Sequence, residues 1–292
     1  MPLVIPPRGP RRALPLRTAA LAAAAFLAGS GAAPAQAPDW EGTFEGRVEP
    51  SRTVVVANHV NGVLETLRFA GGEQVEQGAL LAVIDAAEFE IALRMAQAAL
   101  AEAEAALQLA IDDAGRQTEL TSRGTGSRVA AEQAEAGRRS ASALRDLRRA
   151  EVDAARLALE RARINAPISG VISPPMVSEG AFLETKAGTR LAEILVLDPV
   201  RVAYLVPYGQ RNTALAAAGL RSPAELFERI ELTLLLPSGE EYPHAGRPHF
   251  ESAAIDPDTD TLVVWGRFPN PDRLLVPGLG VRVRATLRDE DG

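Results

Sequence analysis

Hydrophobic and polar positions along the chain follow three different patterns. Between residues 54 and 85, short apolar runs alternate with glycines, which is typical of short strands joined by tight turns. From Leu93 to Ala114, small and apolar residues recur at steps of three and four, which indicates a stripe along an α-helix. From residue 200 onward strand-like runs return, and in 281–287 apolar and polar residues alternate strictly, which predicts a half-buried strand.

Two of the strand-like segments repeat one another 108 residues apart. Val60–Leu64 (VNGVL) is similar to Ile168–Ile172 (ISGVI), and further glycines follow each copy at closely matching distances. Because glycine adopts positive φ angles without steric cost, we expect these glycines to form the turns of one small β-domain that is split in two. They are Gly62, Gly72 and Gly78 in the first copy and Gly170, Gly180 and Gly188 in the second.

The segment between the copies, 86–164, is rich in Ala, Leu, Glu and Arg, which predicts two long helices. We expect Asp85 to cap the first helix in a capping box with Glu88. Gly124 and Gly126 then interrupt the pattern, and so short a connection predicts an antiparallel hairpin. With 37 helical residues the first arm would extend for about 55 Å. Its stripe, which would pack against the second helix, consists of Leu93, Ala96, Leu100, Ala103, Leu107, Ala110 and Ala114.

The second helix is predicted to begin at Ser127, a good N-cap, and to end near Ile164, before Pro167. The last part of this helix carries a stripe at steps of three and four, which consists of Val152, Ala155, Leu159 and Ala162. Leu144 and Leu147, earlier in the helix, are out of phase with this stripe, which predicts a stutter in the repeat.

Beyond Asp198-Pro199, several short strands and one short helix, Gln210–Ala218, favour a small antiparallel barrel. The strands are expected at Val200–Val206, Ile230–Leu236, Leu262–Phe268 and 281–287.

The N-terminal segment predicts export. Four arginines precede a short apolar stretch, Thr18–Leu27, and A-x-A sequences follow, so we expect a secretory signal peptide over 1–37. The apolar stretch is short for a membrane span, which favours cleavage, although retention as an anchor stays open. Four of the 31 basic residues and none of the 38 acidic ones lie in 1–37, so the remainder carries a net charge of −11. Such a charge would repel nucleic acid.

Nothing in the sequence predicts catalysis, a metal site or a cofactor. There is no cysteine, and no GxSxG, HExxH or P-loop pattern occurs. The carboxylate pairs Asp112-Asp113 and Glu240-Glu241 are adjacent residues that point apart, unlike an acid/base couple. The aspartates of 256–260 lack the later Gly and Glu of a calcium loop. Beyond residue 37, the methionines Met95 and Met176 lie far apart in sequence, and the only histidines are His59, His244 and His249. His244 and His249 could lie near one another, but two imidazoles without a further ligand are more often surface residues.

In this order and spacing the segments resemble a known family. Val60–Asp85 resembles the first half of a lipoyl-like domain, and Ile164–Ile172, with its APxxGxI pattern, resembles the second half. Ala254–Thr261 and Asn270–Leu279 resemble the signatures of the barrel that follows. Over roughly residues 45–288, the chain resembles the periplasmic adaptors, or membrane fusion proteins, of tripartite efflux pumps of the resistance-nodulation-division type.

The resemblance implies a mixed α and β, elongated fold. A lipoyl-like β-sandwich would be split by a long antiparallel α-helical hairpin and followed by a small antiparallel β-barrel. Since only about fifteen residues lie between the expected signal peptide and Val54, and the sequence stops shortly after Leu287, we expect the membrane-proximal domain of many family members to be absent or vestigial. The expected domains are a signal peptide (1–37), an N-terminal lead-in (38–53), the first lipoyl-like half (54–85), the hairpin (86–164), the second half (165–197) and the barrel (198–292).

The resemblance also implies a function without enzymatic chemistry. Such an adaptor links an inner-membrane efflux transporter to an outer-membrane channel in the export of small molecules. It would lie in the periplasm, associated with the inner membrane through its partner, and form a homo-oligomeric ring that is hexameric by the resemblance. At the hairpin tip, family members often carry Arg, Leu four residues on and Ser eleven residues after the Arg. Arg116, Leu120 and Ser127 match this spacing and are expected to contact the channel, although Gln117 departs from the usual Leu or Tyr.

Three other functions share features with this one. A lipoyl-type carrier domain needs an acylated lysine at the turn between its halves, but here that turn is the hairpin, which has no lysine, and Lys186 lies within the second half. An adaptor of an ABC-type exporter stays open, and so does a periplasmic coiled-coil scaffold with no role in transport.

Overall fold

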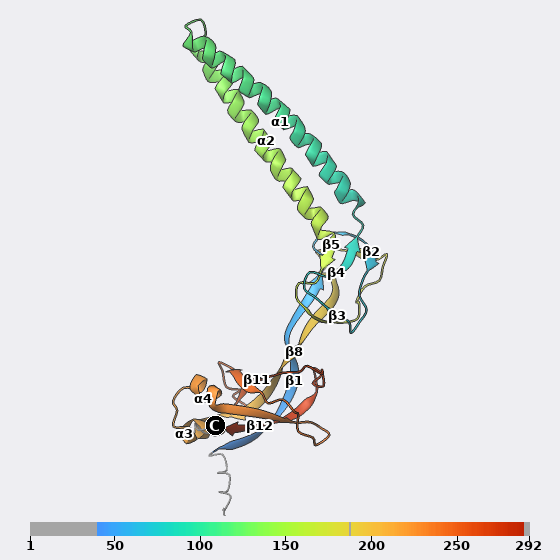
Figure 1. Cartoon of the computed structure of the whole chain (residues 1–292), viewed down its shortest axis with the longest axis vertical. Coiled ribbons are helices and arrows are strands. Elements are labelled where there is room, and N and C mark those ends of the chain that lie inside the picture. Colours follow the sequence, from blue (N-terminus) through green and yellow to red (C-terminus); the bar gives the residue numbers. More distant parts are fainter. Residues whose placement is uncertain (1–39, 187, 289–292) are drawn as a thin grey trace, which may run out of the picture. The chain divides into compact units, whose positions relative to one another are not determined.

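The computed structural model describes residues 40–186 and 188–288, and the predicted signal peptide lies outside them. Figure 1 shows the helical hairpin inserted among the first strands, and α3 and α4 beside the remaining strands. The elements are β1 (Glu41–Ala57), β2 (Gly62–Leu67), β3 (Gln74–Val75), β4 (Leu80–Ile84), α1 (Ala87–Ser122), α2 (Arg128–Arg161), β5 (Arg163–Asn165), β6 (Gly170–Ile172), β7 (Phe182–Leu183), β8 (Arg190–Pro207), α3 (Tyr208–Ala217), α4 (Pro223–Arg229), β9 (Ile230–Leu235), β10 (Arg247–Glu251), β11 (Thr261–Phe268) and β12 (Gly280–Leu287).

The two sequence copies form the two halves of one β-sandwich. The N–H of Gly72 donates to the carbonyl oxygen of Ile172 at 2.8 Å, and at the positions 108 residues away Gly180 donates to Leu64 at 2.8 Å. Each half therefore supplies the same donor and acceptor to the other. The halves also share one core, with fully buried side chains from both; among them are Leu64, Leu81, Ile84, Ile172, Leu183, Leu191 and Ile194. The predicted split β-domain is confirmed.

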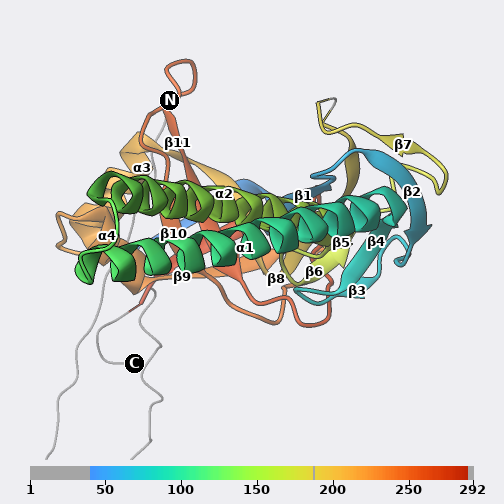
Figure 2. The ribbon, with the colours of Figure 1, turned by 90° about the horizontal axis from the view of Figure 1, so that it is seen from above.

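The hairpin between the halves is formed by α1 and α2, which lie side by side along their length (Figures 1 and 2). The predicted stripe of α1 faces α2, because all seven of its residues are buried or half-buried. Ala86 occupies the N-cap position of α1 and has no capping side-chain atom, so the predicted capping box with Glu88 does not form. The Asp85 carboxylate instead accepts a hydrogen bond from the N–H of Ala87 at 3.0 Å.

The predicted stutter in α2 is wrong, because the heptad repeat continues without a break. Arginines fill the seam positions that the sequence left without an apolar residue, and Leu144 and Leu147 point away from α1. Long arginine stems can cover an apolar seam while their guanidinium groups reach water. The half-buried or buried seam residues at heptad spacing are Arg138, Ala141, Arg145, Arg148, Val152, Ala155, Leu159 and Ala162.

Strands from both sides of the hairpin in the sequence form a barrel in the order β10-β11-β8-β1-β12-β9. Mutual backbone hydrogen bonds between Leu232 and Gly246, at 2.9 and 2.8 Å, connect β9 to the start of β10 and complete the ring of strands. The strictly alternating residues of β12 point into the core as predicted, since 281, 283, 285 and 287 are all buried. The core also holds Phe268, which is fully buried, and Leu226 of α4, a short helix that the sequence pattern did not predict.

Two long strands belong to both the sandwich and the barrel. β1 pairs with β12 through Glu41–Arg47 and with β8 through Gly46–Ala57. Residues 41–53, to which the sequence pattern assigned no element, are thus strand, and β8 continues through Asp198-Pro199, where a break was expected. A register shift between Pro50 and Arg52, in the pairing of β1 with β8, accommodates the prolines within these strands.

Replacing Gly170 with alanine is expected to lower the free energy of unfolding by about 1–3 kcal/mol. A Cβ there would lie 2.6 Å from the Leu195 carbonyl oxygen, in the strand that pairs with β6. Gly209→Ala in α3 is the control, since its Cβ would meet open space, and it should leave stability unchanged or raise it. Urea denaturation measures both, and equal losses in the two variants would contradict the packing argument.

Candidate functional site

The loop at the hairpin tip folds back on the end of α1. The carbonyl oxygen of Leu120 accepts hydrogen bonds from the N–H groups of Thr125 and Gly126, at 3.1 and 2.9 Å. Position 126 requires glycine because a Cβ would lie 2.6 Å from the Thr121 nitrogen. Ser127 occupies the N-cap position of α2 as predicted, but its hydroxyl makes no capping hydrogen bond. These backbone contacts hold the loop in one conformation and leave the Ser127 hydroxyl free of a capping role.

The three predicted tip residues are exposed. Arg116 and Leu120 lie four residues apart and therefore share one side of α1. The Arg116 guanidinium pairs with Asp113 at 3.0 Å, and the Leu120 side chain is 44% exposed. Ser127 begins the other helix, and the bond from Gly126 to Leu120 places the loop beside Leu120. The tip thus offers a cation, an apolar side chain and a hydroxyl near the end of the hairpin.

A groove of about 550 Å³ lies between the helices close to the tip, and the sequence pattern did not predict it. Small residues of α1, Ala114 and Gly115, form part of its wall, and Glu135 and Arg138 line it from α2. Arg138 donates two hydrogen bonds to Glu135, at 2.9 and 2.7 Å. These bonds hold the pKa of the Glu135 carboxyl below its ordinary value. The groove therefore keeps a carboxylate and a guanidinium paired at neutral pH, beside space for a partner's side chain.

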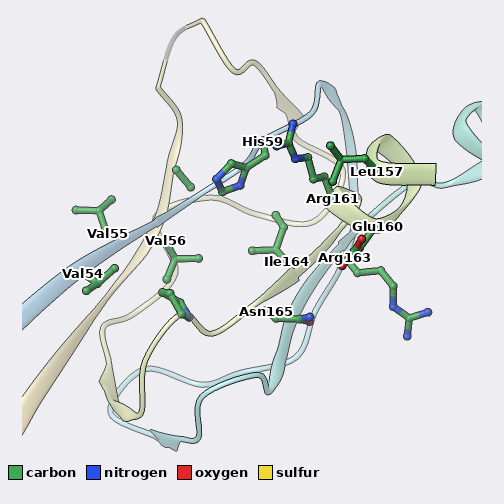
Figure 3. Close-up of a pocket in the computed structure, with 12 residues that line it drawn as sticks. Val54, Val55, Val56, His59, Leu157, Glu160, Arg161, Arg163, Ile164 and Asn165 are labelled. Carbon is green, nitrogen blue, oxygen red and sulfur yellow. The ribbon is translucent and has the colours of Figure 1, made fainter. Parts of the chain in front are cut away.

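A second groove, of about 530 Å³, lies at the base of the hairpin (Figure 3). Its walls come from 54–57 of β1, from the last turn of α2 and from β5. His59 and Arg161 lie close together on one side, with Leu157 beside them, whereas Arg163 extends away (Figure 3). The groove combines apolar and charged walls and holds no constellation suited to catalysis.

The six predicted glycines lie in two structural settings that repeat between the halves. Gly72 and Gly180 have φ angles of 86° and 84°, in the left-handed region, and Gly78 and Gly188 also have positive φ. Gly62 and Gly170 lie where a neighbouring element comes close, since a Cβ at Gly62 would lie 2.5 Å from Ile84. Each glycine of the first copy thus has the role of its counterpart in the second.

The metal-ligating residue types do not gather. Among residues 40–186 and 188–288, no three His, Asp or Glu side chains are arranged to hold a metal ion. His244 and His249 lie edge-on against different aromatic rings, those of Tyr242 and Phe250. Within the same residues, no helix is long and apolar enough to cross a membrane.

An apolar stripe runs along the outside of α2, facing away from α1. We name it the α2 outer stripe. A single-helix pattern could have revealed it, because its members recur at steps of three and four, but the sequence pattern alone does not tell which of two stripes faces the partner helix. Its exposed residues are Leu144, Leu147, Ala150, Ala154 and Leu157.

Two family models match this arrangement of domains. The model described as "RND MFP, barrel-sandwich hybrid domain" matches residues 52–197, which is half of the chain. The chain belongs to the RND membrane fusion proteins. A second model, "RND MFPs, beta-barrel domain", matches residues 215–289 of this membrane fusion protein.

The relatives of this membrane fusion protein carry names from efflux systems. It is 35% identical over 248 residues to the "Efflux pump periplasmic linker BepD" of Brucella suis, covering 82% of this chain and 61% of that protein. It is 30% identical over 242 residues to the "Multidrug efflux pump subunit AcrA" of Escherichia coli, covering 82% of this chain and 60% of that protein. The chain thus spans about three-fifths of the length of these relatives.

A solved structure supports the fold. A MacA–MexA chimera with the α-hairpin domain of Pseudomonas aeruginosa MexA superimposes with a TM-score of 0.60 at 22% identity, covering 85% of this chain and 81% of the other. The predicted family and the predicted arrangement of split sandwich, hairpin and barrel are therefore confirmed.

Proposed function

We propose that this membrane fusion protein is a periplasmic adaptor that links an inner-membrane efflux transporter to an outer-membrane channel for the export of small molecules. The observation that carries the proposal is the hairpin. Two helices of 36 and 34 residues leave the sandwich together, and each extends for about 50 Å. A pair of helices this long would bring its tip to a partner at a distance from the sandwich.

The tip is the part of the hairpin that would contact the channel. Arg116 offers a charged donor, Leu120 an exposed apolar side chain and Ser127 a hydroxyl without a capping bond. The groove that contains the Glu135–Arg138 pair lies next to them and could receive a side chain from the helical ends of a channel. Because Gly126 and the Leu120 carbonyl hold the loop in place, little conformational entropy would be lost on docking.

Copies of the chain would assemble into a ring that seals the conduit, with six copies by the family resemblance. The α2 outer stripe supports this part of the proposal, since it exposes three leucines that a neighbouring hairpin could cover. Head-to-tail contacts that repeat from one copy to the next form a ring when the rotation between copies closes. The inner-membrane transporter would contact the barrel end of the adaptor, in the periplasm.

A cysteine at Ser127, labelled with a thiol-reactive photocrosslinker, is expected to capture an outer-membrane channel protein in whole cells. The chain has no native cysteine, so the label reports this position alone. Mass spectrometry of the crosslinked product identifies the partner. Capture of only further copies of the chain would argue against docking at the tip.

Thr43→Cys, on the exposed outer side of the barrel, is the matched control. It should label equally well but capture no channel. If both positions captured the same channel, the contact would not be specific to the tip.

A further inference from the structure

One face of the barrel carries opposite charges at its two ends. It is the outer side of three neighbouring strands, β10, β11 and β8, together with the turn between β10 and β11. We name it the bipolar face. From one end to the other it presents three arginines (Arg201, Arg247 and Arg267), an apolar centre (Leu205, Phe250, Val263 and Trp265) and three aspartates (Asp256, Asp258 and Asp260).

The arginines form a row across the three strands. Arg247 is directly opposite Arg267, which is directly opposite Arg201. Like charges at such cross-strand positions, with Cβ atoms about 5 Å apart, repel one another. The Glu49 carboxylate is 3.9 Å from the Arg201 guanidinium, whereas Arg247 and Arg267 have no ion pair within the described part of the chain. Both of these arginines are exposed, so their charge faces outward without a partner.

The other end of the face is acidic. The turn between β10 and β11 exposes Asp256, Asp258 and Asp260 within five residues. Asp256 accepts a hydrogen bond from the N–H of Asp258 at 2.9 Å, but no cation in the described residues pairs with any of the three carboxylates. Arg267 lies seven positions after Asp260 in the sequence, which corresponds to about 23 Å along an extended strand.

Between the charged ends, the face is apolar. Phe250 stacks on Trp265 with ring centroids 4.6 Å apart, and Leu205 is 50% exposed beside Val263. The Trp265 indole N–H donates to Glu49 at 3.2 Å, which fixes the ring against the sheet. Aromatic and apolar side chains at the centre of a charged rim are the composition of a contact surface for another protein.

The order of charges determines what can cover this face. A uniformly anionic surface, such as an acidic membrane, would be attracted by the arginine row and repelled by the aspartates. A fitting partner must offer negative, apolar and positive regions in the reverse order. A second copy of this chain, turned so that its strands run antiparallel, offers that order. We propose that two copies pair through the bipolar face, with each arginine row against the aspartate turn of the other copy.

The contact would be two-fold symmetric and small. The midpoint between Asp258 and Arg267 falls next to Val263, so the two-fold axis would cross β11 there and place the apolar centres on each other. Three strands span about 14 Å, so the face covers only a few hundred Å² a side against the roughly 800 Å² of a standard interface. We therefore expect a weak, concentration-dependent pair. A two-fold contact closes on itself, so the pair is distinct from the proposed ring and does not depend on the docking of the hairpin tip.

Disulfide trapping in the purified chain tests the pair. Val263→Cys, in a protein without other cysteines, should give a crosslinked dimer on oxidation, because the two thiols would meet at the axis. Thr233→Cys, on β9 and outside the bipolar face, is the control and should give at least tenfold less dimer. Circular dichroism confirms that each variant is folded.

Charge reversal makes the test decisive. Arg267→Asp in the Val263→Cys background puts one added carboxylate against the aspartate turn at both ends of the contact, and Asp258→Arg puts one added guanidinium against the arginine row at both ends. Each variant alone should lose at least tenfold of the crosslinked dimer, whereas an equimolar mixture should recover it, because both contacts then join opposite charges. Failure of the mixture to recover, or crosslinking unaffected by either reversal, would overturn the proposal. So would retention on anionic phosphatidylglycerol vesicles that Arg267→Asp abolishes while the dimer is absent throughout.

Discussion

Replacing Phe268 with alanine is expected to lower the free energy of unfolding by about 3–5 kcal/mol, the range for truncating a fully buried phenylalanine. Phe268 is completely buried in the barrel, and two glycines make room for its ring. A Cβ at Gly246 would lie 2.4 Å from the ring, and one at Gly266 would lie 3.0 Å from it. Neighbouring backbone cannot collapse into the space that the ring leaves without breaking strand pairs, so a cavity would remain. Urea denaturation followed by circular dichroism measures the change.

Phe250→Ala is the matched control, because this phenylalanine lies on the outer side of the same barrel and is 38% exposed. Loss of its stacking on Trp265 is expected to cost about 1 kcal/mol. If the two variants lost equal stability, the barrel core would not depend on Phe268 as the packing indicates.

Replacing Val152 with aspartate is expected to destabilise the hairpin by about 3 kcal/mol or more, since it would leave a carboxylate buried without a partner. Val152 is the buried residue of α2, 5% exposed, and faces the stripe of α1. Arg148 on the preceding turn already donates two hydrogen bonds to Glu151, so it offers the new charge little compensation. Far-UV circular dichroism during thermal unfolding should show the helical signal lost at lower temperature. If the proposed function is right, the variant should also fail to restore drug tolerance in a deletion strain.

The control for this change is Val129→Asp, in the first turn of α2. Val129 is 59% exposed, and an acidic residue near a helix N-terminus interacts favourably with the helix dipole. This variant should keep its stability. Unfolding at the same lowered temperature in both variants would show that the seam at Val152 does not hold the hairpin together.

The hairpin shows which seam residues hydrophobic periodicity can predict and which it cannot. The stripe of α1 was predictable residue by residue, because its leucines and alanines recur without a break at steps of three and four. The seam of α2 was not, because Arg145 and Arg148 occupy positions that the pattern reads as polar surface. Whether a long side chain covers a seam or extends into water depends on the neighbouring helix, and a one-helix pattern contains no information about that neighbour.

The strands that contain proline show a second limit of prediction from the sequence. Asp198-Pro199 reads as a break, and the segment that contains Pro50 was assigned no element, yet β8 and β1 pass through them and join the sandwich to the barrel. Proline is compatible with a strand where its missing N–H faces no partner, and only the pairing of strands reveals such a position. Strand β10, with Pro248 inside it, escaped prediction for the same reason. At the tip, Arg116, Leu120 and Ser127 came from a family spacing, and their role in docking stays a prediction.

The sequence by itself determined the parts of this protein. Glycine spacing, the 108-residue repeat and the helical stripe are local properties of the chain, so they specified a split β-domain, a hairpin and further strands. Only the tertiary structure decided which surfaces these parts share. The fusion of sandwich and barrel through two strands, the arginines in the hairpin seam and the bipolar face all arise from residues far apart in sequence. Such contacts depend on which elements pair and in what register, and no short stretch of sequence specifies that choice.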